Sequence, residues 1–229
     1  MTGNGNTLAG SRLKRLAERS RAQRPHAQEH CELCRAPIPA EHRHLLDLTT
    51  RELMCACRPC TVLFDSSAAG GGHYRLVPDR RMRIVDFELE DLAWEELRIP
   101  VEMAFFFDST QTERVVAFYP GPMGATESLL ELDAWQALAG ANPVLSQLEP
   151  DVEALLINRA KGARDYWLVP IDECYSLAGL IRTSWRGLTG GKEVWQQIGR
   201  FFEALDRRSR SYQRDGLRQA QATSERKVQ

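Results

Sequence analysis

The sequence lacks any run of about 18 consecutive apolar residues, the length that a transmembrane helix needs. The basic residues near its N-terminus are not followed by an apolar stretch either, so no secretory signal is expected. Both absences predict a cytoplasmic protein without membrane insertion. In that reducing compartment, paired cysteines bind metal more often than they form disulfides.

Histidine is scarce and confined to one end of the chain, since all five residues lie between His26 and His73. A Ser/His/Asp or Cys/His nucleophilic arrangement therefore has no convincing partner set in the remaining sequence. The three glycines Gly70–Gly72 are not followed by Gly-Lys-Ser/Thr, which argues against a phosphate-binding loop. The acidic residues from Asp86 to Glu96 are spread evenly, as on a solvated face. We expect a protein without enzymatic activity.

Cysteine is concentrated in one segment, because five of the six cysteines lie between residues 31 and 60. Two Cys-x-x-Cys pairs can each present two thiolates to one ion, and together they complete a tetrahedral cage. The sequence therefore predicts a closed, structural metal site with Cys31, Cys34, Cys57 and Cys60 as its ligands. Zinc is the expected ion, and iron is the alternative because an all-thiolate cage also accepts iron.

Several neighbouring residues leave details of this site open. Cys55 could lie beside the metal as a spare thiol or replace Cys57 as a ligand, although the two-residue spacer favours Cys57. One of the histidines His30, His42 and His44 could replace a thiolate.

The turns that carry the cysteine pairs also depart from the usual pattern. Arg35 and Thr61 stand where such turns often have glycine, and Pro59 lacks an N–H that could bond a sulfur. We therefore expect metal binding, with a geometry that is less regular than that of a typical ribbon.

The expected fold class is α+β. A zinc-ribbon or rubredoxin-like module would be followed by an antiparallel-sheet domain with C-terminal helices. Within the module, 44–48 and 52–56 read as a β-hairpin between the cysteine pairs. The predicted segments are a basic, largely disordered tail (1–29), the four-cysteine module (30–65), a Gly-rich hinge (66–72), the α+β domain (73–205) and a basic C-terminal tail (206–229).

Hydrophobic patterns place the elements of the second domain. Strands are predicted over 101–107, 114–119, 154–158 and 166–169. Helices are predicted over 126–138, over 173–186 with Asp172 as N-cap, and over 192–208. Two units of hairpin plus helix could be a duplication with both helices on one face, but ordinary α+β alternation has the same appearance.

The net charge of −1 conceals a segregation of charge. Residues 1–25 carry six basic groups against one acidic group, and residues 206–229 carry seven against three, so the stretch between them is acidic. An acidic body makes nucleic-acid binding unlikely. A zinc-ribbon nucleic-acid binder that uses the basic tails remains a further alternative.

Three strings around the cysteines, Cys31–Ile38, His42–Leu48 and Cys55–Cys60, resemble the DUF5947 proteins, an uncharacterised bacterial family. Two later strings, Pro170–Arg182 and Trp185–Trp195, fit the same family. The resemblance implies an accessory role beside a [NiFe]-hydrogenase, since such proteins are associated with hydrogenase gene clusters. The implied partner is a hydrogenase or one of its maturation proteins, and no catalytic residue is implied. A rubredoxin-like electron-transfer protein with iron is the alternative function.

Overall fold

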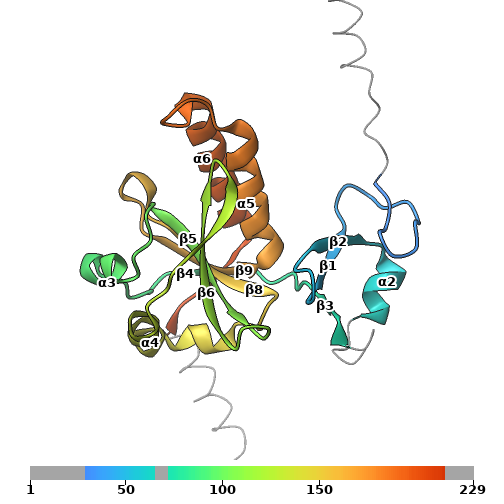
Figure 1. Cartoon of the computed structure of the whole chain (residues 1–229), viewed down its shortest axis with the longest axis horizontal. Coiled ribbons are helices and arrows are strands. Elements are labelled where there is room, and N and C mark those ends of the chain that lie inside the picture. Colours follow the sequence, from blue (N-terminus) through green and yellow to red (C-terminus); the bar gives the residue numbers. More distant parts are fainter. Residues whose placement is uncertain (1–28, 65–71, 215–229) are drawn as a thin grey trace, which may run out of the picture.

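The computed structural model describes residues 29–64 and 72–214, which form two β-sheets lying side by side (Figure 1). Their mixture of helices and mainly antiparallel strands confirms the predicted α+β class. Residues 1–28 of the predicted N-terminal tail, most of the predicted hinge and the chain after Arg214 lie outside these residues. No helix within the two stretches is long and apolar enough to cross a membrane.

The smaller sheet is built around the predicted hairpin. Its strand order is β2-β1-β3, and both pairings are antiparallel. The hairpin turn is stabilised by Asp47, whose carboxylate accepts hydrogen bonds from the N–H groups of Thr49 and Thr50 at 2.8 and 3.1 Å. The elements are β1 (Arg43–Asp47), β2 (Leu53–Ala56), helix α2 (Arg58–Leu63) and β3 (Tyr74–Leu76). We call residues 29–64 together with β3 the cysteine module.

The larger sheet has seven strands in the order β10-β4-β9-β8-β5-β6-β7. All its pairings are antiparallel except that of β10 with β4, which is parallel. Its strands are β4 (Met82–Ile84), β5 (Met103–Ser109), β6 (Arg114–Gly121), β7 (Gly124–Ser128), β8 (Glu153–Asn158), β9 (Asp165–Pro170) and β10 (Arg210–Tyr212). The four predicted strands correspond to β5, β6, β8 and β9.

Helices cover both faces of the larger sheet, and alternating side chains of β5 define two cores. Phe105 and Phe107 pack with α5 and α6, whereas Ala104 and Phe106 pack with residues of α4. The two predicted hairpins are therefore neighbours in one sheet, but the helices that follow them lie on opposite faces. The helical elements are α3 (Asp91–Glu96), α4 (Leu132–Ala141), α5 (Ile171–Ser184), α6 (Gly191–Arg208) and the 3₁₀ turns η2 (Pro143–Gln147) and η3 (Ala160–Gly162).

Two local predictions in this part were wrong. The helix predicted over 126–138 begins only at Leu132, and residues 126–128 belong to strand β7, because a tight turn between Gly121 and Gly124 returns the chain against β6. Gly124 has a φ of 102°, which permits that turn. Asp172 is also not an N-cap, since α5 begins after Pro170 and the Asp172 carboxylate contacts His44 instead.

Two short strands of the larger sheet were not predicted. They are β4 and β10, and each has three residues. Strand β10 lies within the segment that was expected to be a C-terminal tail.

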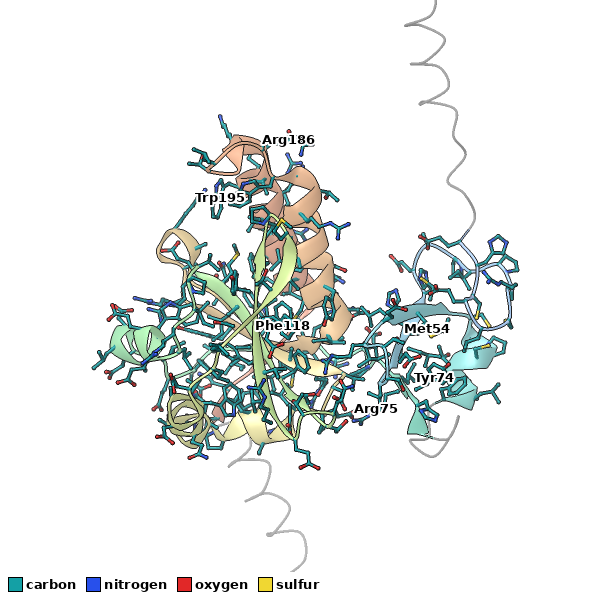
Figure 2. All side chains as sticks on the ribbon, viewed as in Figure 1. Met54, Tyr74, Arg75, Phe118, Arg186 and Trp195 are labelled. Atoms are coloured by element: carbon teal, nitrogen blue, oxygen red, sulfur yellow. The ribbon has the colours of Figure 1, made fainter. Side chains whose placement is uncertain are left out.

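The hairpin β1–β2 packs against the cysteine cluster on one side and against the core of the larger sheet on the other. Leu45 packs against the cysteines, whereas Leu46, on the opposite side of the strand, joins the core that contains Phe107. Arg51 donates a hydrogen bond to Ser109 Oγ at 3.0 Å, and its guanidinium carbon lies 4.6 Å from the centre of the Phe107 ring. Arg75 lies at the same junction (Figure 2), where it donates to the Pro150 carbonyl at 2.7 Å.

Candidate metal centre

The first cysteine pair lies in a tight turn that precedes β1. The N–H of Arg35 donates to the Cys31 carbonyl, and the N–H of Cys31 donates to the Ala36 carbonyl, both at 2.8 Å. Arg35 has a φ of 63°, in the left-handed region that favours glycine. The turn therefore has the backbone shape of a cysteine knuckle although arginine occupies the glycine position.

The second pair lies at the start of a helix and not in a second β-turn as expected. Cys57 is the N-cap of α2, and Cys60 lies in the first turn. Pro59 suits that turn, since the first helical N–H groups have no carbonyl partner within the helix. The absence of an N–H in Pro59 therefore costs the helix no hydrogen bond. This explains why proline occupies a position that it does not usually have in a regular ribbon.

The two pairs converge on one point. The Sγ atoms of Cys31, Cys34, Cys57 and Cys60 all lie within 4.8 Å of one another, and those of Cys34 and Cys57 are 3.5 Å apart. Sulfurs bound to one tetrahedral ion at about 2.3 Å would be separated by about 3.8 Å. The four predicted ligands are thus close enough to hold a metal ion.

The ionisation of the cluster also suits a cation. Burial raises the pKa of the Cys31 thiol, but hydrogen bonds from the backbone N–H groups of Cys57, Cys34 and Leu33 outweigh it and lower that pKa to about 6. The pKa of Cys60 is raised by burial and by the neighbouring thiols. At Cys34 the backbone N–H of Ala36 lowers the pKa, yet hydrogen bonds with the Cys57 and Cys31 thiols leave it raised. Adjacent sulfurs resist ionising together, and a divalent ion would remove that conflict.

The apolar core of the cysteine module is small. This core contains six buried residues, and three of them, Cys31, Cys57 and Cys60, are the predicted metal ligands. The others are Ile38, Leu45 and Ala56. So few buried groups cannot fold a module of this size by hydrophobic burial alone, which makes the cysteine cluster central to its stability.

Cys55 and two histidines form a separate group. Cys55 pairs with His44 across β1 and β2, and these two residues and His42 each bring a ligand atom within 4.8 Å of the others. His30 pairs with Pro37 in an isolated bridge. The four-cysteine group contains neither Cys55 nor a histidine. Sequence reasoning named all three residues but did not combine them, because it paired the strands without fixing their register.

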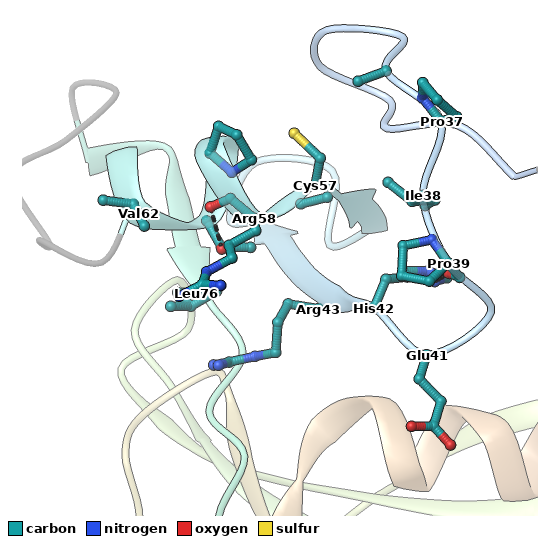
Figure 3. A pocket seen from close by; sticks show the side chains of 14 residues that line it. Pro37, Ile38, Pro39, Glu41, His42, Arg43, Cys57, Arg58, Val62 and Leu76 are labelled. Atoms are coloured by element: carbon teal, nitrogen blue, oxygen red, sulfur yellow. Dashed lines mark hydrogen bonds between the residues drawn. The ribbon is translucent and has the colours of Figure 1, made fainter.

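A groove of about 760 Å³ runs beside the cluster, between the segment 36–43, β1 and α2 (Figure 3). Ile38, Val62 and Leu76 supply apolar walls, and Arg43 and Arg58 supply charge. Cys57 also lines the groove, so its shape depends on the cysteine cluster.

The other residues considered in the sequence lie outside these sites. Cys174 is fully buried in the core beneath α5, as its helical spacing predicts. The acidic residues of α3 and the preceding segment lie at the surface, where Asp91 contacts Arg159 and Arg164. Among the described residues, neither Cys174 nor these acidic residues make a hydrogen bond or ion pair with a histidine.

Comparison with known proteins gives one family. The model of a family of unknown function, DUF5947, matches residues 30–209, which include the cysteine module and nearly all of the larger sheet and its helices. No curated protein and no solved structure matches the chain.

Proposed function

The chain belongs to the DUF5947 family, and we propose that it is a non-enzymatic accessory or scaffold protein whose cysteine module is held by one structural zinc ion. The observation that carries this proposal is the convergence of four cysteine sulfurs within 4.8 Å. Four thiolates fill the coordination sphere of zinc and leave no position for a substrate. The ion would therefore act on folding, and not on chemistry.

The folding free energy that zinc binding supplies also supports a structural zinc ion at this site. Structural zinc contributes about 10–16 kcal/mol to the folding of small modules. The cysteine module has few other buried residues, so its fold would depend on the ion. The module that we propose is a zinc-ribbon-like finger whose second cysteine pair lies on a helix.

Loss of a ligand tests the structural role. We expect Cys57→Ser to unfold residues 30–64 and to leave the larger sheet folded but less stable, because Leu46 would no longer pack on it. Limited proteolysis with circular dichroism measures this, with Cys174→Ala as a control that leaves the cluster intact. Unchanged proteolysis of Cys57→Ser would contradict a structural metal.

The proposed partner is a [NiFe]-hydrogenase or one of its maturation proteins, in the cytoplasm. This part of the proposal rests on the resemblance of the cysteine and C-terminal strings. A tagged chain should be produced together with these proteins and purified with its metal retained. We expect one of them to co-purify with the wild type and to be lost with Cys57→Ser. Absence of all of them from the wild type would refute the hydrogenase link.

Electron transfer is a second candidate, favoured by the exposure of Cys34. A ligand sulfur in contact with solvent offers a route for an electron to an iron ion in the same cage. This function requires iron and a reversible one-electron couple. A zinc-loaded, colourless protein would refute it. Nucleic-acid binding would depend on the basic tails, of which residues 1–28 and 215–229 lie outside the described residues, whereas 206–214 include the end of α6 and strand β10.

A further inference from the structure

The hairpin carries a second group of metal-binding side chains, on residues that the four-cysteine cluster does not use. His42 and His44 are two positions apart, so their side chains lie on the same side of the chain as it enters β1. Cys55 is the direct partner of His44 on β2. One ring nitrogen of each histidine and the Cys55 sulfur lie within 4.8 Å of one another.

Each histidine has its Nδ1 engaged by an oxygen. His44 Nδ1 is 2.8 Å from Asp172 Oδ2, and His42 Nδ1 is 3.0 Å from the Pro39 carbonyl and 3.5 Å from Glu29 Oε2. A carbonyl oxygen can only accept, so His42 carries its proton on Nδ1, and the Asp172 carboxylate favours the same tautomer for His44. Both Nε2 atoms then keep a free lone pair, which is the arrangement found at histidines that bind metals.

His42 Nε2 is a buried polar atom that needs a partner. The His42 side chain is 8% exposed, and Nε2 makes no hydrogen bond to any residue in the stretches 29–64 and 72–214. Buried nitrogens are nearly always satisfied in folded proteins. A cation between His42, His44 and Cys55 would satisfy it.

The charges around the group also suit a cation. Asp172 and Glu29 contact the two histidines, and Glu32 accepts a hydrogen bond from the N–H of Cys55 at 2.6 Å. Three carboxylates therefore surround two imidazole rings and one thiol. The side chains of His44 and Asp172 are 28% and 19% exposed, so solvent reaches one side of the group.

We propose that His42 Nε2, His44 Nε2 and Cys55 Sγ form a second zinc site whose fourth position is open to water or an anionic ligand. Zinc accepts imidazole and thiolate together, and sites with three protein ligands keep one exchangeable position. Zinc would hold the three ligand atoms at separations of about 3.3–3.6 Å. Asp172 is a positioning residue that orients His44 from α5.

Zinc content tests the proposal on the full chain. After equilibration with excess zinc and desalting, we expect two zinc ions per wild-type chain and one in Cys55→Ala and in His42→Ala. Cys174→Ala, which removes a buried thiol elsewhere, should keep two. One ion in the wild type, or two in Cys55→Ala, would overturn the proposal. Neither result would count against the four-cysteine site, because Cys55→Ala and His42→Ala change none of its ligands.

Cobalt gives a second readout, which begins with the wild-type chain. One equivalent of zinc is added first to fill the four-cysteine site, and Co²⁺ is then titrated into the wild type. We expect four-coordinate d–d bands and a thiolate-to-cobalt band, the latter absent from Cys55→Ala. Asp172→Asn should weaken cobalt binding by about 10–100-fold. The absence of four-coordinate bands, or a thiolate band that persists in Cys55→Ala, would refute the site.

Discussion

His44 on strand β1 and Asp172 at the start of helix α5 are 128 positions apart in sequence, yet His44 Nδ1 and Asp172 Oδ2 are separated by 2.8 Å. This contact joins the cysteine module to the helix that covers the larger sheet. Leu46, two positions further along β1, belongs to the core that also contains Phe105 and Trp167. The module is therefore packed against the larger sheet.

The first prediction concerns that shared core. Leu46 is 2% exposed, so Leu46→Ala should lower the free energy of unfolding by about 2–5 kcal/mol. All five tryptophans lie after residue 93, so tryptophan fluorescence reports on the larger sheet and its helices. A shift in the urea midpoint of this signal would show that a module residue stabilises the larger part. The control Leu63→Ala, at a side chain 66% exposed, should change the free energy by less than about 0.5 kcal/mol. Equal effects of the two substitutions would contradict the packing.

The second prediction concerns a buried carboxylate. Glu153 is 1% exposed and accepts a hydrogen bond from Arg80 Nε at 2.8 Å. Arg80→Leu would leave this carboxylate without its cation and should cost about 3–5 kcal/mol of stability. The exposed pair of Arg114 and Glu127, 3.2 Å apart, provides the control. Arg114→Leu should cost about 0–1 kcal/mol. Urea denaturation of both variants measures these losses of stability. A smaller loss in Arg80→Leu than in Arg114→Leu would contradict the role of Arg80.

The third prediction concerns thiol reactivity. Burial raises the pKa of the Cys174 thiol well above its ordinary value, with smaller contributions from the charges of Asp172 and Glu173. The thiolate is the reactive form, so at pH 8 the native protein should leave Cys174 unmodified by iodoacetamide. In guanidinium the pKa returns to its ordinary value, and Cys174 should react. Mass spectrometry of the peptide that contains Cys174 measures both states. Equal modification in the two conditions would show that this helix opens readily.

The fourth prediction concerns the turn of the first cysteine pair. Arg35 has a φ of 63°, a conformation that costs a non-glycine residue roughly 1 kcal/mol. Arg35→Gly should therefore leave the module intact and tighten its retention of metal against a chelator. The reference is Arg58→Gly, in the first turn of α2, where glycine is unfavourable in a helix. Faster metal loss from Arg35→Gly than from the wild type would contradict a left-handed knuckle.

Local patterns were enough to predict much of this fold. The cysteine spacing identified the four residues that converge, and hydrophobic periodicity located the main strands and the helices α5 and α6. These signals need only a few neighbouring residues. The helix predicted over 126–138 was given too early a start, because pairing with β6 decides the conformation of residues 124–128 and the partner strand is not visible in the local sequence.

The group of His42, His44 and Cys55 shows the limit of such reasoning for a site. The exact register of β1 and β2 sets Cys55 opposite His44, and the fold of the whole chain brings Asp172 to the same histidine. Neither relationship follows from spacing. A thiol that matches no Cys-x-x-Cys pair, near two histidines in an alternating pattern, is the signal that could have directed attention to it.

The most direct test of the account is metal analysis with a visible spectrum on the Cys55→Ala chain, purified anaerobically from cells supplied with both zinc and iron. This variant keeps only the four-cysteine site. We predict one zinc per chain, no visible band, and no metal once Cys34→Ser is added. A chain without metal would contradict the structural site. One iron with thiolate-to-iron charge-transfer bands would contradict zinc and make electron transfer the leading function.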